Sequence, residues 1–496
     1  MHELANIIPK KQDAFYRYFH PYFTKLPPNV ASKYISYFSK PNDVVLDPFC
    51  GSGVVGIESI LLGRKTICSD LSPLAFFISR ELMNNKININ ELVNEFTSIK
   101  NDTLSLIQKI WSYGNENLYL QKNSFFDQLK KEYWYPQGSL SYRSNIFCVE
   151  DLYDVRQLLT YAVLFDRISE IQNTSLKNTT LIAFFGAMSR ANLTYMVSGT
   201  RGGSVLHNGG SSLFSIYDYR KPTNVVVVPV WERFERRFND IIKIKINTEK
   251  MFSQINPKVL ASSKVLKLDV LDLSKKVTAE SVDYVLTDPP YGGKIPYLEL
   301  ASMWSHWMGW NISKSDLKKE IIEGGELGKN QESYVDLMSK SLSSMSEALK
   351  ERGHLSMIYQ HNNINVWCSL LESAKSNNLE FKSSFIQSTN SSTVIKKKYK
   401  GNIISAPLII NFQKISSASK VRGNVISNKN LLKEISKSLN LIDINSDEEV
   451  YNFLTKLISD FELFTDVVYV ESLFNEFAMK NGRNEEFYFS THSVKK

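Results

Sequence analysis

A β-α-β unit near the amino terminus limits the folds that this chain can adopt. The apolar stretch 43–47 predicts a short strand, 57–62 predicts a helix, and 65–69 predicts a second strand. Gly63 provides a stop signal for the helix, and the second strand ends in Asp70. Two strands joined by a helix are typical of open α/β sheets, which bind their ligands at the carboxyl ends of the strands.

A glycine turn follows the first strand of this unit. It reads Asp47-Pro48-Phe49-Cys50-Gly51-Ser52-Gly53 and leads into the helix. Glycines let the backbone approach a ligand closely, and Asp70 can accept hydrogen bonds from ribose hydroxyls. The spacing Gly51-x-Gly53-x-x-Gly56 also satisfies the dinucleotide fingerprint, so a nicotinamide oxidoreductase is an alternative. The Asp47 carboxylate favours a cationic sulfonium and amino-acid ligand, because it would repel a pyrophosphate.

A second candidate site, Asp288-Pro289-Pro290-Tyr291, follows the apolar strand predicted over 283–287. Each proline fixes φ and lacks an N–H donor, which leaves nearby carbonyl oxygens free to accept hydrogen bonds. Tyr291 can stack on a ring, and Asp288 can accept a hydrogen bond from an amino group. The segment therefore suits the binding of a flat heterocycle through its exocyclic amine.

Together the two segments resemble motifs I and IV of the amino-group methyltransferases, which use S-adenosylmethionine (SAM). Within that superfamily the chain is similar to bacterial site-specific DNA methyltransferases of the adenine-N6 type. Further segments resemble motif X, motif III, the stretch after the catalytic loop and the fifth strand: 20–28, 268–273, 296–300 and 353–361. The resemblance covers residues 20–85 and 255–415. It implies an α/β fold with a Rossmann-like SAM-dependent methyltransferase sheet.

The resemblance also assigns roles to single residues. Asp288 and the Pro289 carbonyl accept hydrogen bonds from the target amine, and Tyr291 stacks on the base. Asp70 bonds the cofactor ribose, and Asp269 orients its adenine. The catalytic residues are Asp288, Pro289, Pro290 and Tyr291. The cofactor-binding residues are Lys25, Asp47, Pro48, Phe49, Gly51, Gly53, Asp70, Leu71, Asp269 and Val270.

The reaction that the resemblance implies is a direct in-line displacement with neither a metal nor a covalent intermediate. Its rate would come from orientation and electrostatics. The target base must leave the stack of double-stranded DNA, because a stacked base cannot reach such a pocket. In this family, Asp before Pro-Pro favours adenine N6, with cytosine N4 as the alternative. Asp-Pro-Pro-Tyr also resembles tRNA guanine methyltransferases, whose added N-terminal RNA-binding domain has no room before Asp47. A catalytically silent DNA-binding subunit is disfavoured by the intact motifs.

Composition limits the remaining classes of protein. A chain of 496 residues suggests two or three domains. No apolar run approaches the roughly 20 residues that span a membrane, and no secretory signal is visible. The four cysteines are scattered without a C-x-x-C pair, which favours a reducing cytoplasm over a zinc site or a disulfide framework. Cys50 is expected to be a pocket-wall residue rather than a nucleophile. A net charge of +8, with an acidic stretch at 443–487, leaves a basic body that suits a polyanion.

The pattern along the chain predicts four parts. Residues 1–85 and 256–415 form the two halves of the methyltransferase domain, and 264–415 is expected to complete a parallel sheet. Residues 86–255 form a helical and glycine-rich insertion with helices over 151–171 and 180–190. In the helix that opens at 231–238, Phe234 and Phe238 share one face. Residues 416–496 form an α-helical appendage.

The insertion has two interpretations. It either recognises the target sequence, or its helices only cover the sheet while its glycine loops cover the cofactor. Under the first, the residues that face DNA are Arg190, Asn192, Tyr195, Arg201, His207, Tyr217, Tyr219, Arg220 and Lys221. The basic run Lys396–Lys400 is either a phosphate clamp or a solvated turn, and His306 and His361 are expected to be structural. The resemblance adds a restriction or phage-defence partner; the recognition sequence and the oligomeric state are left open.

Overall fold

The computed structural model describes most of the chain between Leu4 and Ser416. The described residues are 4, 7–10, 16, 19–114, 124–140, 146, 148–196, 210–222, 225–293, 295–361, 363–386 and 407–416. The predicted appendage after residue 416 and the basic run Lys396–Lys400 lie outside these ranges.

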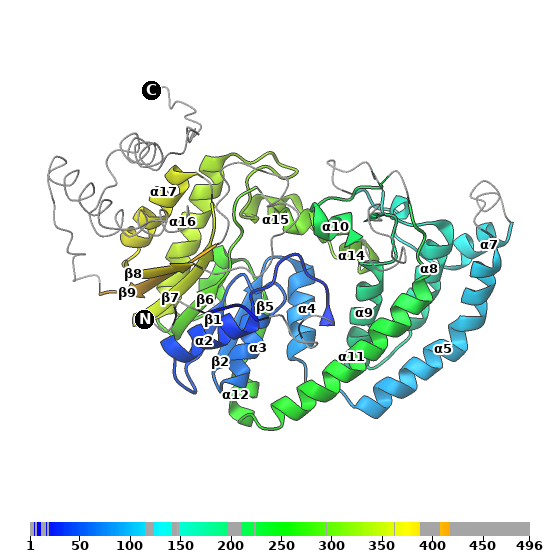
Figure 1. The fold of residues 1–496 in the computed structure, drawn as a ribbon, viewed down its shortest axis with the longest axis horizontal. Coiled ribbons are helices and arrows are strands. Elements are labelled where there is room, and N and C mark those ends of the chain that lie inside the picture. Colours follow the sequence, from blue (N-terminus) through cyan, green and yellow to red (C-terminus); the bar gives the residue numbers. More distant parts are fainter. Residues whose placement is uncertain are drawn as a thin grey trace.

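A seven-stranded sheet occupies the left part of the described structure in Figure 1. The strand order is β5-β2-β1-β6-β7-β9-β8. The strands are β1 (Val44–Asp47), β2 (Lys65–Asp70), β5 (Lys264–Lys267), β6 (Val282–Thr287), β7 (Leu349–Tyr359), β8 (Leu379–Ile386) and β9 (Leu408–Lys414). With helices between most of the strands, this sheet confirms the α/β fold class expected from the sequence.

The sheet is mixed rather than wholly parallel. Strands β5, β2, β1, β6 and β7 pair in parallel. Strand β9, in contrast, pairs antiparallel with both β7 and β8. The expectation of a parallel sheet over 264–415 is therefore wrong for its last strand. Strands β8 and β9 are neighbours in sequence and in the sheet, and such a pair can run antiparallel without a crossover helix.

Side chains alternate between the two faces of the sheet, and each face has its own core. Val45 and Tyr284 belong to one buried cluster, which also contains residues of the insertion. Leu46 and Val285, their neighbours along the same strands, belong to a second cluster on the other face. Because side chains of a strand point alternately to opposite faces, short apolar runs such as 44–47 can be buried on both sides.

Helices cover both faces of the sheet. In the first half of the chain they are α2 (Pro28–Phe38), α3 (Val54–Leu61) and α4 (Pro73–Met83). In the second half they are α12 (Pro257–Ser262), α16 (Gln331–Ala348) and α17 (Ile364–Ser376). Three short helices lie between β6 and α16 in the sequence: α13 (Tyr297–Leu300), α14 (Ser302–Trp307) and α15 (Lys314–Lys319). A short 3-10 helix, η3 (Val270–Lys275), follows β5.

The residues between α4 and α12 gather to one side of the sheet as a group of helices (Figure 1). They are α5 (Ile89–Ser112), α7 (Ser124–Glu132), η2 (Glu150–Leu152), α8 (Val155–Ser169), α9 (Thr174–Met188), α10 (Ser212–Ser215) and α11 (Val230–Phe252). A two-stranded sheet of β3 (Tyr195–Met196) and β4 (Gly210–Ser211) lies in the same region of the sequence. Helices α8 and α9 overlap the two predicted helices, 151–171 and 180–190, although α9 begins six residues earlier than predicted. Phe234 and Phe238 are fully buried on one face of α11, as expected.

Among the helices of the described ranges, none combines the length and the hydropathy that crossing a bilayer requires.

Candidate active site

The glycine turn and the double-proline loop lie next to each other. Strands β1 and β6 are parallel neighbours, with Val45 paired to Tyr284 and Leu46 paired to Val285. The segments that follow Asp47 and Thr287 therefore leave the sheet at the same edge. The Thr287 hydroxyl donates a hydrogen bond of 2.7 Å to Asp47 Oδ1 and joins the two loops directly.

The glycine turn depends on backbone conformations that favour glycine. Gly51 has φ +48° and Gly53 has φ +80°, both in the left-handed region. A Cβ atom on Gly53 would lie 2.9 Å from the Cβ of Ser79, and one on Gly51 would lie 3.0 Å from the ring of Tyr22. The turn can therefore pass close to α4 and to the segment 20–28 only because these positions lack a side chain.

Asp70 is held at the end of β2 by backbone donors. Its carboxylate accepts hydrogen bonds from the amides of Gly51 and Ser72, each at 2.9 Å. Burial nevertheless raises the pKa of Asp70 to about 6, because two backbone bonds only partly replace the lost water. The arrangement fixes an acidic group beside the glycine turn.

Asp269 lies on the neighbouring strand end, after β5. Its Oδ1 accepts a hydrogen bond of 3.1 Å from the Leu271 amide, so Asp269 caps the amino-terminal end of η3. Its Oδ2 is buried without a hydrogen-bond partner, and the Lys319 ammonium lies 3.7 Å away. Burial raises the pKa of Asp269. A buried acceptor without a hydrogen bond is unfavourable, so this oxygen is suited to receive a donor from a ligand.

Asp288 and Tyr291 are joined within the double-proline loop. The Tyr291 hydroxyl donates a short hydrogen bond to Asp288 Oδ1. Burial raises the pKa of Asp288 to about 7 and that of Asp47 to about 7. Asp288 contributes to the shift of Asp47, because the negative charges of the two carboxylates repel each other. Asp47 and Asp288, each with a pKa of about 7, thus line the same pocket.

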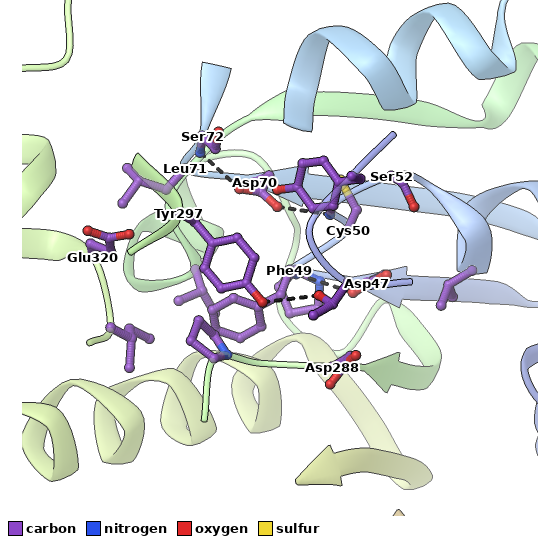
Figure 2. A pocket seen from close by; sticks show the side chains of 18 of the residues that line it. Asp47, Phe49, Cys50, Ser52, Asp70, Leu71, Ser72, Asp288, Tyr297 and Glu320 are labelled. Atoms are coloured by element: carbon purple, nitrogen blue, oxygen red, sulfur yellow. Dashed lines mark hydrogen bonds between the residues drawn. The ribbon is translucent and has the colours of Figure 1, made fainter. Parts of the chain in front are cut away.

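These loops line a single pocket, shown in Figure 2 with Asp47, Asp70, Asp288 and Tyr297 around it. Of the fourteen predicted site residues, those that line the pocket are Lys25, Asp47, Pro48, Phe49, Gly51, Asp70, Leu71, Asp269, Val270, Asp288 and Pro290. Gly53, Pro289 and Tyr291 do not line it, although each adjoins a residue that does. Cys50 lies in the pocket wall and is buried, as expected.

The segment before α2 closes one side of the pocket. Lys25 donates hydrogen bonds to the backbone oxygens of Tyr16 and His20, at 2.7 and 2.6 Å. Burial lowers the pKa of Lys25 to about 7. Thr24 Oγ1 lies 3.1 Å from the hydroxyl of Tyr297, which crosses the pocket from α13. The cation expected near the ligand is therefore already engaged by the backbone.

Three pocket residues without any sequence motif come from the end of α15: Lys319, Glu320 and Ile321. Lys319 donates a hydrogen bond of 2.9 Å to Asp272 and so ties the end of α15 to η3. Glu320 Oε1 accepts a hydrogen bond of 2.9 Å from the Leu298 amide, and burial raises the pKa of this carboxyl to about 7. Tyr22, Thr24, Tyr297 and Leu298 also line the pocket. These four lie in the segments 20–28 and 296–300, which resemble motif X and the stretch after the catalytic loop, but they were not among the predicted site residues.

Several residues proposed to face DNA are buried instead. Asn192 and Tyr219 are 1% exposed and Tyr195 is 7% exposed. The Tyr219 hydroxyl donates to the Leu300 carbonyl at 2.6 Å and accepts from the Met303 amide at 3.1 Å. The prediction that these three read DNA is therefore wrong, because their side chains hold the protein together. Arg190, Arg220 and Lys221 are exposed and Tyr217 is half-buried. Arg201 and His207 lie outside the described residues.

The two histidines have structural contacts. His306 Nδ1 lies 2.7 Å from the Ser302 carbonyl within α14. His361 Nε2 lies 3.1 Å from Glu323 Oε1, behind the double-proline loop. Both contacts agree with the structural roles expected from the sequence.

The chain matches known proteins mainly through its first part. Residues 5–89 match the DNA methylase family model N6_N4_Mtase. The chain is 41% identical over 73 residues to the ribosomal protein L11 methyltransferase of Carboxydothermus hydrogenoformans, covering 14% of this chain and 21% of the relative. It is 24% identical over 115 residues to the Type II methyltransferase M.MjaII of Methanocaldococcus jannaschii, covering 23% of this chain and 21% of the relative. The chain thus spans about a fifth of the length of these curated relatives.

Two solved structures were also matched. TrmN from Thermus thermophilus has a TM-score of 0.27 at 10% identity, over 79% of this chain and 49% of that chain. The rRNA methyltransferase aviRa from Streptomyces viridochromogenes has a TM-score of 0.30 at 9% identity, over 83% of this chain and 97% of that chain. The segment matched by the family model contains Asp47, Gly51, Gly53 and Asp70, so the resemblance to DNA methyltransferases predicted from the sequence is confirmed over residues 5–89.

Proposed function

We propose that this protein transfers a methyl group from SAM to the exocyclic amine of a base in double-stranded DNA, with adenine N6 as the target. The observation that carries the proposal is the single pocket that Asp47, Asp70, Asp269 and Asp288 line together. The family match over residues 5–89 and the partial similarity to a Type II methyltransferase support it.

The pocket residues fit SAM as the cofactor. Asp269 Oδ2, buried without a hydrogen-bond partner, would accept a hydrogen bond from the adenine amine of SAM. Asp70 would bond the ribose hydroxyls, with Leu71 and Val270 beside the adenine. Asp47 and the glycine turn would hold the cationic methionine end. Bound in this way, SAM supplies an electrophilic methyl group on a sulfonium.

Asp288 would orient the target amine. Tyr291 engages Asp288 Oδ1, so Oδ2 is the oxygen that would accept a hydrogen bond from the amine. This bond, with one to the Pro289 carbonyl, would draw the nitrogen lone pair out of ring conjugation and aim it at the methyl carbon. The nitrogen–carbon bond forms as the sulfur–carbon bond breaks, and the sulfur keeps the electron pair. The amine proton then leaves to Asp288, whose pKa of about 7 suits a proton acceptor at neutral pH, or to water.

The base must be extruded from the duplex to reach this pocket, at a cost of a few kcal/mol. Tyr291 would stack on the extruded base. Asp at the first position of the Asp-Pro-Pro-Tyr segment favours adenine N6 over cytosine N4. A tRNA guanine target is the weaker alternative, because it rests on the same four residues alone.

We further propose the four-part organisation expected from the sequence, with the insertion 86–255 as the region that contacts the target. The exposed side chains of Arg190, Arg220 and Lys221 support a contact with DNA phosphates. A role in restriction-modification or phage defence, with a partner nuclease, fits the family and remains part of the proposal.

Incubation with tritiated SAM and either duplex DNA or tRNA, followed by digestion to nucleosides, tests the proposal. We expect label in N6-methyl-2′-deoxyadenosine from the DNA. Label in N4-methylcytosine or in a methylguanosine would overturn the adenine assignment. Label that stays with protein rather than with either nucleic acid would overturn the DNA assignment, and the partial match to a protein methyltransferase makes that control necessary.

A further inference from the structure

Two buried tyrosines lie directly behind the double-proline loop. Tyr334 belongs to α16 and Tyr359 ends β7, and neither is measurably exposed. The Tyr334 hydroxyl oxygen lies 2.8 Å from the Pro290 carbonyl oxygen and 2.8 Å from the Tyr359 hydroxyl oxygen. Neither tyrosine lines the pocket, and neither is among the site residues predicted from the sequence, although Tyr359 lies in the segment 353–361 that resembles the fifth strand.

The direction of this hydrogen-bond chain follows from the number of protons. The Pro290 carbonyl can only accept, so the single hydroxyl proton of Tyr334 must point to it. Tyr334 then has no second proton, and the contact with Tyr359 requires that Tyr359 donates. The chain therefore runs from the Tyr359 hydroxyl to the Tyr334 oxygen and from the Tyr334 hydroxyl to the Pro290 carbonyl. Successive bonds of this kind polarise and strengthen one another.

A histidine ring holds both tyrosines in place. The His361 ring is stacked with Tyr334 at 5.8 Å between centroids and an interplanar angle of 20°. It is stacked with Tyr359 at 6.4 Å and 9°. The Asn363 amide donates to His361 Nδ1 at 3.1 Å, so Nδ1 is an acceptor and the ring N–H lies on Nε2. Nε2 therefore donates to Glu323, 3.1 Å away, which fixes the orientation of the ring.

The bond from Tyr334 fixes one particular peptide unit. The Pro290 carbonyl and the Tyr291 amide share a plane, because the peptide bond between them is planar. Tyr291 in turn donates to Asp288, and its ring makes a T-shaped contact with the Tyr359 ring, at 6.0 Å between centroids and an interplanar angle of 89°. The two tyrosines thus hold Tyr291 at its backbone and at its ring.

We infer that Tyr334, supported by Tyr359, is a positioning residue for the catalytic loop: it orients Tyr291 and, through it, Asp288 toward the target amine. The inference rests on the proposed methyl transfer. Tyr334 contacts the pocket-lining Pro290 only at its backbone carbonyl and does not itself line the pocket, so we expect it to act on the rate of the chemical step and to leave SAM binding unchanged. A displacement of reacting groups by 1 Å lowers rates by up to about 100-fold, so loss of this restraint should lower the rate measurably.

The test compares Tyr334→Phe, Tyr359→Phe and the double variant with a matched control. Tyr161→Phe is that control, because Tyr161 is fully buried and donates a hydrogen bond of 3.1 Å to the Ala191 carbonyl, away from the pocket. Single-turnover methyl transfer to duplex DNA, SAM affinity by calorimetry and thermal unfolding are measured for each. These readouts separate a lost catalytic orientation from a general loss of stability.

We expect Tyr334→Phe to transfer methyl groups about tenfold more slowly, with unchanged SAM affinity, while Tyr161→Phe keeps the wild-type rate. Tyr359→Phe should show a smaller decrease, and the double variant should equal Tyr334→Phe, because Tyr359 acts through the Tyr334 hydroxyl. A Tyr334→Phe protein with the wild-type rate overturns the inference. If that variant does not fold, Tyr359→Phe decides: a slower rate at equal SAM affinity supports the inference, and an unchanged rate overturns it. A wild-type protein that transfers no methyl group overturns the proposed function itself.

Discussion

Thr287 donates a buried hydrogen bond of 2.7 Å to Asp47, although the two residues are 240 positions apart in the chain. This bond connects the end of β6 to the end of β1 and so joins the double-proline loop to the glycine turn. It also counteracts the effect of burial on Asp47, since it lowers a pKa that burial raises to about 7.

Thr287→Val should therefore destabilise the protein. Valine has nearly the same shape but cannot donate, so a buried carboxyl oxygen loses its strongest partner at a cost of roughly 1–3 kcal/mol. The free energy of unfolding from urea titration at neutral pH measures this loss. Thr287→Ser is the matched control, because it keeps the hydroxyl. Equal stability of the Val and Ser variants would show that the bond contributes nothing.

Gly53→Ala should destabilise the protein through the backbone and through a clash. The φ of +80° is unfavourable for alanine, and the new Cβ would lie 2.9 Å from the Cβ of Ser79. We expect a loss on the order of 1–3 kcal/mol, together with weaker SAM binding because the turn must shift. Gly114→Ala is the control, since no atom lies within 4 Å of its added Cβ. Similar unfolding curves for the two variants would contradict this assignment.

Asp288→Ala should abolish methyl transfer while SAM binding is retained. The carboxylate is needed to orient the amine, whereas Asp70 and Asp269 are the acids expected to hold the cofactor. Transfer of label to duplex DNA and calorimetric titration with SAM measure the two properties separately. Wild-type turnover in this variant would remove Asp288 from the mechanism.

The stability of the protein should depend on the ionisation of Glu320. Burial raises the pKa of this carboxyl from 4.5 to about 7, so the folded state binds its proton more tightly than the unfolded state does. The contribution of Glu320 to stability is therefore fully present below pH 4.5 and is lost as the pH rises to about 7.

Glu320→Gln removes this dependence. We expect the variant to gain stability relative to the wild type as the pH rises from 4.5 to about 7, with a constant difference above that range. Unfolding titrations of both proteins at several pH values give the difference. A difference that does not change with pH would mean that Glu320 has the same pKa in both states.

Local signals predicted the parts of the site that lie on the first β-α-β unit and on β6. Few folds other than an open α/β sheet combine a short apolar run, a glycine turn and an acid at the end of the next strand. In such a sheet, Asp47 and Asp288 come together because β1 and β6 are parallel neighbours. Glu320 and Lys319 carry no such signal, because it is a tertiary contact, the hydrogen bond from Lys319 to Asp272, that ties the end of α15 to the pocket. Tyr219 and Asn192 were misassigned for a related reason: polar side chains in a glycine-rich region suggest an exposed surface, and only tertiary contacts show that they are buried. The direction of β9 could not be read from its apolar run, since burial alone does not distinguish parallel from antiparallel pairing.

A crystal structure with sinefungin, an amine analogue of SAM, tests the central claim most directly. The account predicts that the analogue lies between the glycine turn and the double-proline loop, with its ribose at Asp70, its adenine at Asp269 and its amine directed toward Asp288. An analogue bound elsewhere, or one whose amine points away from Asp288, would contradict the claim that the two loops form one catalytic pocket.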